Sequence, residues 1–406
     1  MKITAFKMTE LGPIPSDWVV KRLGEMLSFK NGFNANAKCY GTGTPVASVL
    51  DALSNEPITT ETIATKVTAD DKDRESFSLT KGDLIFTRSS ETLEDVGRAN
   101  VYFDDAPAMF GGFVIRGRFK IQANPIFVNY LLKTSDNRLH VMSQGAGAQH
   151  FNIGQLGLEN VLIALPPLPE QHRIAAALSD MDELIWGLGK LVEKKRAIKT
   201  GAMQRLLTGQ TRLPGFGGTG FKQTELGSIP SDWEVKRLGE VCSITTGHKD
   251  VNEGCETGRY PFFTCSRSIF ASAEYSFDCE AILVAGNGDV GNLHYFSGKF
   301  EAYQRTYVLH SFLEDTGFIF HELTNHLMSR LNHGKIGSSI PYITIEQLYA
   351  FLLPLPPLPE QRAIAAVLSD MDAEIAALEA EKHKVEAIKQ GMMQELLTGR
   401  TRLEHD

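Results

Sequence analysis

Two stretches of the chain carry the same spacing of hydrophobic positions, which alternates between four and three residues. Such spacing is typical of an amphipathic helix with a narrow apolar seam, as in a coiled coil. It predicts long helices over residues 166–208 and 356–400. Each expected helix follows a stiff LPPLP segment and ends in LLTG, where Gly209 and Gly399 suit the left-handed C-cap position. The seam residues are Ile174, Leu178, Met181, Ile185, Leu188 and Val192 in the first copy, and Ile364, Leu368, Met371, Ile375, Leu378, Val385 and Ile388 in the second.

The two helices belong to a larger duplication. LPPLPEQHRIAAALSDMDELI begins at Leu165 and returns as LPPLPEQRAIAAVLSDMDAEI at Leu355. TELGPIPSDWVVKRLGEM begins at Thr9 and returns as TELGSIPSDWEVKRLGEV at Thr224, and we call these two segments the Trp elements. Each half thus reads as a Trp element, a divergent region, a Pro-rich hinge and a long helix. Antiparallel pairing of the two helices would give an internal pseudo-two-fold repeat, whereas the alternative is that each helix packs on its own globular domain.

The two divergent regions share a frame of short apolar runs but differ in their loops. GDLIFTRSS, from Gly82, and CEAILVAGNG, from Cys279, each read as a strand that runs into a polar loop. Further strands, a helical stretch and a Gly- or Ser-rich loop (GAGAQHFNI or KIGSSIPYI) follow in both halves. The expected domains are 1–165 (with the Trp element 9–26), the helix 166–208, a Gly/Pro linker at 209–220, 221–355 (with the Trp element 224–241) and the helix 356–400.

Composition narrows the class of protein. A chain of 406 residues with 42% hydrophobic and 22% charged residues is typical of a globular protein with two or three domains. We expect no signal peptide, because the N-terminal MKITAFKMTELGPIPSDW has no apolar h-region, and no membrane span, because no apolar run reaches about 18 residues. Five cysteines without a C-x-x-C pair suggest reduced thiols in a cytoplasm. The net charge of −8 is unfavourable for phosphate contacts, although a basic loop or a basic partner subunit could supply the field.

Two motifs suggest enzymatic sites, and both have simpler interpretations. GNGDVG, from Gly286, matches a dinucleotide-binding fingerprint, but the following NLHYFSGKFEAYQ lacks helical periodicity and predicts a hairpin. NPIF resembles a methyltransferase motif without its second proline, and Asn124 as N-cap with Pro125 at the first helical position explains the same residues. A zinc site on Cys255, Cys265, Cys279 and a histidine fits no familiar ligand spacing. The sequence therefore predicts a binding protein without a catalytic, cofactor-binding or metal site.

The order of these features resembles the specificity subunits of type I restriction–modification enzymes, from Thr9 to Leu403. The motifs that carry the resemblance are the two Trp elements, the two PLPPLPEQ hinges and the two helices ending in LLTG. The resemblance implies an α+β fold in which two long antiparallel coiled-coil helices join two mixed α/β target recognition domains. It also implies that the subunit is non-catalytic and binds a split, asymmetric double-stranded DNA site. Each domain would read one half of that site.

The resemblance implies partners as well. The helices would dock two methyltransferase subunits, which bind S-adenosylmethionine and methylate adenine at N6. Two restriction subunits would add translocation and cleavage that depend on ATP and Mg. The chain itself would bind no cofactor and no membrane, and it would work in a prokaryotic cytoplasm.

Base-reading residues are expected on the polar loops, because Arg suits guanine and Asn or Gln suits adenine in the major groove. Trp18 and Trp233 recur in the shared frame and are expected to be packing anchors. Two other functions fit parts of the sequence: a duplicated coiled-coil scaffold that binds proteins without reading DNA, and a self-sufficient adenine methyltransferase suggested by NPIF. The candidate DNA-binding residues are Arg88, Ser89, Ser90, Arg98, Gln149 and His150 in the first half, and His248, Lys249, Asn287, Asn292, Arg305, Ser338 and Ser339 in the second.

Overall fold

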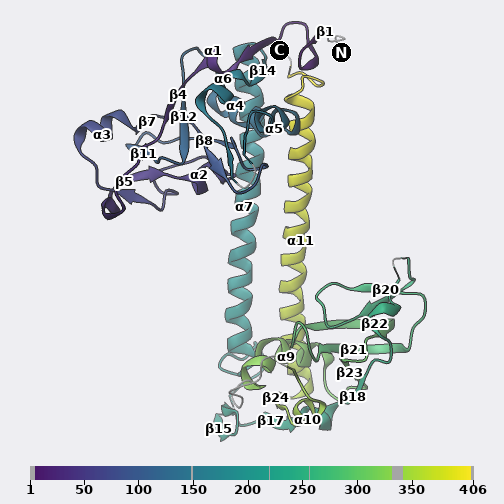
Figure 1. Ribbon diagram of the computed structural model, residues 1–406. Coiled ribbons are helices and arrows are strands. Elements are labelled where there is room, and N and C mark those ends of the chain that lie inside the picture. Colours follow the sequence, from purple (N-terminus) through teal and green to yellow (C-terminus); the bar gives the residue numbers. More distant parts are fainter. Residues whose placement is uncertain (1–4, 148–149, 219, 256, 332–341, 404–406) are drawn as a thin grey trace. The chain divides into compact units, whose positions relative to one another are not determined.

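The computed structural model describes residues 5–147, 150–218, 220–255, 257–331 and 342–403 (Figure 1). The chain forms two compact units. Unit 1 comprises residues Met1–Gly187 and Lys382–Asp406, and unit 2 comprises residues Leu188–Glu381. Each unit therefore contains one divergent region and a part of each long helix.

Two β-sheets form the divergent region of unit 1. The first has the order β10 (Ala99–Val101), β8 (Leu84–Thr87), β12 (Val114–Phe119), β4 (Leu27–Asn31), with antiparallel neighbours. The second has the order β6 (Lys66–Val67), β5 (Tyr40–Ala47), β11 (Ala108–Phe110), β7 (Ser78–Leu79), and its β5–β11 pair is parallel. All residues of β8 are buried, which explains its unbroken apolar run in the sequence.

Helices follow the sheets in unit 1. Helix α4 (Pro125–Leu132) begins at the expected cap, where the Asn124 side chain accepts a hydrogen bond from the backbone N–H of Phe127 (3.0 Å). This confirms NPIF as a helix start. The helical stretch expected here is divided into α4 and α5 (Ser135–Met142), because Thr134 has an extended backbone.

The other elements of unit 1 before α7 are β1 (Phe6–Thr9), β2 (Gly12–Pro15), β3 (Val19–Arg22), α1 (Leu23–Met26), η1 (Ala37–Cys39), α2 (Val49–Leu53), α3 (Asp71–Ser76), β9 (Ser89–Ser90), β13 (Phe151–Asn152), α6 (Gln155–Asn160) and β14 (Leu162–Leu165).

The divergent region of unit 2 has a six-stranded sheet. Its order is β18 (Ser243–Thr246), β23 (Thr306–His310), β21 (Phe277–Ala285), β22 (Leu293–Ala302), β19 (Tyr260–Phe263), β20 (Phe270–Ser272). The GNGDVG segment joins the antiparallel strands β21 and β22, so the expected hairpin is confirmed. The other elements are β15 (Phe221–Thr224), β16 (Gly227–Pro230), β17 (Glu234–Arg237), α8 (Leu238–Val241), η2 (Val251–Glu253), α9 (Thr316–Leu331), α10 (Ile345–Tyr349) and β24 (Leu352–Leu355).

The long helices are α7 (Leu168–Leu206) and α11 (Leu358–Leu396), drawn in teal and yellow in Figure 1. Within each unit, ion pairs join α7 to α11 or to the segment directly after it. In unit 1 the partner of Glu170 comes later in the chain than the partner of Asp182, so the helices are antiparallel as expected. The described part of the chain contains no helix with the length and apolarity of a membrane span. The ion pairs are Glu170–Arg402, with Arg402 just beyond the end of α11, and Asp182–Lys389 in unit 1, and Lys195–Glu374, Arg196–Glu379 and Lys199–Asp372 in unit 2.

The apolar seam of the helices is buried at most of the expected positions. Leu178 in unit 1 and Leu368 in unit 2 are fully buried. The expectation for Ile388 was wrong, because 46% of its surface is exposed, and Met392 packs against the unit 1 core instead. The reason is geometric: a helix with 3.6 residues per turn drifts away from a strict seven-residue repeat.

The Trp elements anchor the first turns of the long helices. Trp18 and Trp233 are fully buried, which confirms them as packing anchors. The indole Nε1 of Trp18 donates to Glu170 at the start of α7 (3.3 Å), and that of Trp233 donates to Glu360 at the start of α11 (3.2 Å). The same contact therefore fixes the hinge in both units.

The segments that follow the long helices pack on the Trp elements. Gly209 and Gly399 both have a φ of +69°, which confirms the expected C-caps. A Cβ at Gly399 would lie 2.4 Å from Cγ of Pro15, and a Cβ at Gly209 would lie 2.4 Å from Cγ of Pro230. Both positions therefore require glycine for close approach as well as for backbone conformation.

Candidate nucleic-acid interface

The polar loop after β8 is the centre of a candidate reading surface in unit 1. Strand β9 pairs antiparallel with β13, which brings two loops that are distant in the sequence together. The hydroxyl of Ser89 donates to Oδ1 of Asn152 (2.5 Å), and His150 is exposed directly before β13. We define surface 1 as Arg88, Ser89, Ser90, His150 and Asn152.

Arg88 is hydrogen-bonded through its backbone, whereas its side chain makes no polar contact with a described residue. Its N–H donates to the carbonyl of Phe113 (2.9 Å), and its own carbonyl accepts from the N–H of Ile153 (2.9 Å). Its half-buried guanidinium forms no hydrogen bond or ion pair with any residue that the structure describes. Phe113, beside it, is 70% exposed. A guanidinium without an internal partner, carried on a hydrogen-bonded backbone, is suited to a bidentate contact with guanine.

Arg98 has a different environment. Its guanidinium pairs with Asp95 (3.1 Å) and donates to the carbonyl of Leu53 (3.3 Å). Its backbone N–H donates to Oγ1 of Thr87 at the end of β8 (3.0 Å). These contacts hold the loop that carries surface 1. Gln149 lies outside the described residues.

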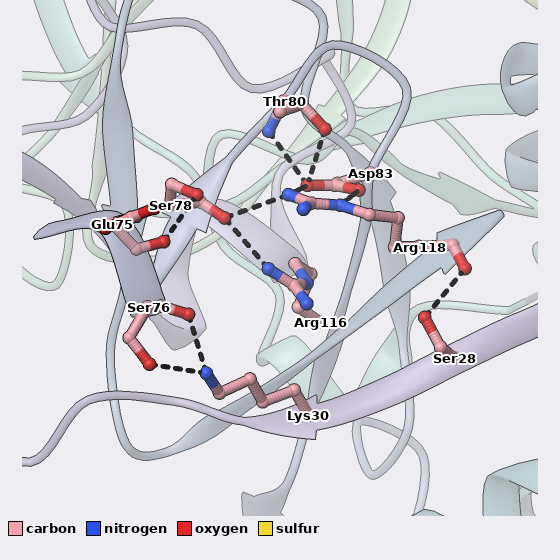
Figure 2. Close-up of polar contacts among 9 residues, drawn as sticks. All are labelled: Ser28, Lys30, Glu75, Ser76, Ser78, Thr80, Asp83, Arg116 and Arg118. Atoms are coloured by element: carbon pink, nitrogen blue, oxygen red, sulfur yellow. Dashed lines mark hydrogen bonds and ion pairs between the residues drawn. The ribbon is translucent and has the colours of Figure 1, made fainter. Parts of the chain in front are cut away.

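Other cationic side chains of this region form hydrogen bonds and ion pairs within the domain, as Figure 2 shows. Lys30 donates to the carbonyl and the hydroxyl of Ser76 (both 2.7 Å), and Arg118 donates to both carboxylate oxygens of Asp83 (2.9 and 2.7 Å). Arg116 is buried, and burial together with the charge of Arg118 lowers its pKa. The three cations hold the segment that leads from α3 to β8 against β4 and β12, so their hydrogen bonds are made within the domain.

The tip of the β21–β22 hairpin forms a second polar surface, in unit 2. Nδ2 of Asn292 donates to the carbonyl of Ser266 (3.2 Å) and lies 3.0 Å from Nε2 of His294. Arg305 is exposed, and its carbonyl accepts from the N–H of Gly286 (3.1 Å). Asn287 is half-buried, and its amide has no hydrogen-bond partner within the described ranges. We define surface 2 as Asn287, Asn292 and Arg305.

The remaining candidates of the second half do not join surface 2. The ring of His248 stacks on Phe277 (centroids 6.3 Å apart), and Lys249 pairs with Glu274 (3.2 Å). These contacts fix both side chains near the start of β21, whereas Asn287 follows its end. Ser338 and Ser339 lie outside the described residues.

Two exposed residues at or beside surface 1 were not among the candidates from the sequence: Asn152 and Phe113. Asn152 lies within the polar GAGAQHFNI loop, so its residue type and position were a usable signal. Phe113 gave no such signal, because it belongs to an apolar run, FGGFVI, that reads as a buried strand. Its exposure follows from its place directly before β12, where the chain turns out of the sheet.

Comparison with known families gives a match in both halves of the chain. The family described as "Type I restriction modification DNA specificity domain" matches residues 15–194 and 230–387. Each match covers one divergent region together with much of the long helix that follows. The family match therefore repeats along the chain in the same way as the sequence motifs.

Individual relatives agree with this match. The chain is 26% identical over 426 residues to the type I restriction enzyme MjaVIII specificity subunit of Methanocaldococcus jannaschii, an alignment of 97% of this chain and 95% of that protein. It is 36% identical over 172 residues to the EcoDI specificity subunit of Escherichia coli, which covers 42% of this chain and 38% of that protein. The fold is similar to the crystal structure of the type I restriction–modification S subunit from M. genitalium, with a TM-score of 0.64, 16% identity and coverage of 96% and 97% of the two chains.

Proposed function

The chain belongs to the family of type I restriction–modification DNA specificity subunits, and from this premise we propose that it reads a split, asymmetric DNA site. The observation that carries the proposal is the duplicated frame with two unlike polar surfaces. Surface 1 presents serines, a histidine, an asparagine and an arginine without a side-chain partner among the described residues, whereas surface 2 presents two asparagines and an arginine. Two readers with different donor and acceptor groups would recognise two different half-sites.

The long helices would serve as the spacer and as the docking platform. A helix of 39 residues is about 58 Å long at 1.5 Å per residue, which exceeds the roughly 34 Å of one turn of DNA. The near-identity of the two hinges and helices offers equivalent surfaces to two identical partners. We propose that these partners are two methyltransferase subunits, which carry S-adenosylmethionine and methylate adenine at N6.

In the proposed complex this chain supplies recognition and no chemistry. Restriction subunits, two per complex, would provide the activity that requires ATP and Mg. The net charge of −8 is compatible with this role, because partner subunits would supply much of the positive surface that faces the DNA phosphates. A scaffold that binds only proteins is less favoured, because it gives no role to the polar hairpin tip or to Arg88, whose half-buried guanidinium has no partner among the described residues.

The deciding experiment is a genome-wide map of N6-methyladenine in cells that contain the methyltransferase partner, with this gene present or deleted. A methylated motif of two short halves with a fixed, unspecified gap, lost on deletion, is the expected result. It would also identify the bases that the two surfaces read. Unchanged methylation in an active system would contradict the proposal and leave the scaffold as the better explanation.

A further inference from the structure

The two units correspond in their contacts as well as in their repeated motifs. In unit 1 the N–H of Asn124 donates to Oε1 of Gln171 (2.9 Å), at the start of α4. In unit 2 the N–H of Asp315 donates to Oε1 of Gln361 (3.0 Å), at the start of α9. Residues of the two divergent regions can therefore be compared place by place, although their sequences differ.

The turn that leads into β12 and the turn that leads into β23 are one such pair. In unit 1 the N–H of Val114 donates to the carbonyl of Gly111 (3.1 Å), which closes turn 1. In unit 2 the N–H of Thr306 donates to the carbonyl of Tyr303 (2.8 Å), which closes turn 2. Both turns follow a strand that pairs in parallel with its neighbour, β11 with β5 and β22 with β19.

Each turn is also hydrogen-bonded to the polar loop of its unit. The N–H of Arg88, directly after β8, donates to the carbonyl of Phe113 in turn 1 (2.9 Å). The N–H of Gly286, directly after β21, donates to the carbonyl of Arg305 in turn 2 (3.1 Å). Phe113 and Arg305 therefore occupy the same place in the two units.

The side chains at this place have opposite chemistry. Arg305 belongs to surface 2, and its exposed guanidinium forms no hydrogen bond or ion pair with any residue that the structure describes. Phe113 is 70% exposed beside Arg88 of surface 1. Since unit 2 has an arginine at the same place, the shared frame does not require an apolar side chain there. The ring of Phe113 is thus not part of the core that the two units have in common.

The backbone of turn 1 is closely packed. The N–H of Gly111 donates to the carbonyl of Ala47 (2.9 Å), and a Cβ at Gly112 would lie 1.7 Å from Oδ1 of Asn34. Any other residue at position 112 would therefore require Asn34 to move. A ring carried on such a backbone loses little conformational freedom when it binds, which favours its use in recognition.

The surroundings of Phe113 are apolar. It lies at a groove of about 330 Å³, whose other walls include Tyr40, Val46, Val49 and Leu50. None of the described residues that line this groove is charged, so the groove is unsuited to a DNA phosphate. The apolar group that base edges present in the major groove is the 5-methyl group of thymine, for which phenylalanine is a suitable contact.

We propose that Phe113 determines part of the specificity of unit 1 by contacting the 5-methyl group of a thymine in its half-site. At the same place unit 2 presents Arg305, whose guanidinium suits guanine. The two turns would therefore contribute to the difference between the half-sites. This inference rests on the proposed function and deepens it, because it assigns one base to one residue.

The test uses the full chain in complex with its methyltransferase partner, and duplexes that carry the site found in the methylation map. Arg88→Ala identifies the half-site that unit 1 reads. Each thymine of that half-site is then replaced in turn by uracil, which removes only the methyl group. At one position the affinity of the unmodified complex should fall about fourfold, as expected for one buried methyl group.

Three variants show whether Phe113 makes this contact. Phe113→Ala should bind the thymine and uracil duplexes at that position equally. Phe113→Leu keeps an apolar side chain and should retain most of the difference. Phe103→Ala is the matched control, because Phe103 is another exposed phenylalanine of unit 1 (43%) and does not line the groove, so this variant should distinguish the duplexes as the unmodified chain does.

Several results would overturn the inference. One is equal affinity for all the uracil-containing duplexes in an unmodified complex that still prefers its own site, which leaves the proposed function intact and needs no variant. A half-site of unit 1 without thymine in either strand is another. If Phe113→Ala weakens assembly with the methyltransferase but keeps the thymine preference, Phe113 contacts the partner and not DNA. An unmodified complex without any sequence preference would refute the proposed function, and the inference with it.

Discussion

Arg402, which follows α11, holds Glu170 in the first turn of α7 through two hydrogen bonds, from Nε to Oε1 (2.6 Å) and from Nη2 to Oε2 (2.7 Å). The same guanidinium donates two further hydrogen bonds to Asp17 (2.9 and 2.7 Å). The bonds to Glu170, and next those to Asp17, raise the pKa of Arg402, so it stays charged. We call this arrangement an arginine clamp. Arg212 forms the same clamp in unit 2 with Asp232 and Glu360.

Loss of the clamp should destabilise unit 1. Arg402→Met would leave the buried carboxylate of Glu170 without its cation, and such a loss costs about 3 kcal/mol. Urea unfolding of the full chain measures the change in free energy. Arg74→Met is the control, because its ion pair with Asp71 is exposed and should contribute less than about 1 kcal/mol. Equal effects of the two substitutions would contradict a structural role for the clamp.

His321 should make unit 2 sensitive to acid. It occupies the place that Tyr130 has in unit 1, with Nε2 3.3 Å from Oγ of Ser369. Burial, and next the charge of Lys199, lower the pKa of His321 to about 4. An unfolded histidine titrates near pH 6.5, so below that pH the unfolded state binds a proton that the folded state does not. The free energy of unfolding should therefore fall between about pH 6.5 and 4, by as much as about 3 kcal/mol.

Urea unfolding at pH 7 and pH 4.5 measures this effect. His321→Gln should lose stability over this range by less than the unmodified chain does, because its side chain does not titrate. The protonation of carboxylates is common to both proteins and cancels in the comparison. Parallel losses in both would exclude His321 as the source of the acid sensitivity.

Asp83 should be essential for the charge cluster of Figure 2. Its carboxylate is almost fully buried and accepts from Arg118, from the N–H of Thr80 (2.8 Å) and from the Thr80 hydroxyl (3.2 Å). Asp83→Asn would leave two neighbouring guanidinium groups without a carboxylate and should cost about 3 kcal/mol of unfolding free energy. Ser28→Ala removes only one exposed hydrogen bond of the same cluster and serves as the control. If both variants unfold at the same urea concentration, the cluster does not depend on its charge balance.

Arg88 and Arg98 should differ in how their loss affects DNA recognition. Arg88→Ala should relax the base preference at one position of one half-site, by about 1–3 kcal/mol, because no described residue of the chain engages its guanidinium. Arg98→Ala should instead lower stability and overall affinity, because it removes the contacts to Asp95 and Leu53. Methylation maps of cells with each variant distinguish the two effects. A changed preference in both half-sites for Arg88→Ala would be inconsistent with independent readers.

The length of the helix pair should determine the gap between the half-sites. Four residues inserted into both α7 and α11 add about 6 Å to each helix. We expect a longer gap with both half-site sequences unchanged, visible in the same methylation map. Insertion into one helix only is the control, since it would break the pairing and abolish methylation. A gap of unchanged length would refute the role of the helices as a ruler.

The long helices, the duplication and the family were evident from the sequence, because each depends on local or repeated patterns. An alternation of four and three apolar spacings predicts a helix without knowledge of its neighbours. The strand at Leu84–Thr87 and the hairpin at GNGDVG were likewise readable, since an apolar run and a turn are short-range features. The helix start at Asn124 was predicted from two adjacent residues.

Only the tertiary structure decided what the charged residues do. Arg212 lies in a segment that reads as a flexible linker, yet it binds Asp232 and Glu360. Arg88 and Arg98 were equivalent candidates on loops, and the structure distinguishes them because, among the residues that it describes, Arg98 meets a carboxylate and Arg88 does not. The position of an arginine in the sequence determines its charge and reach, but the path of the whole chain determines which acid it meets. Such contacts between distant residues are therefore settled by packing and not by local pattern.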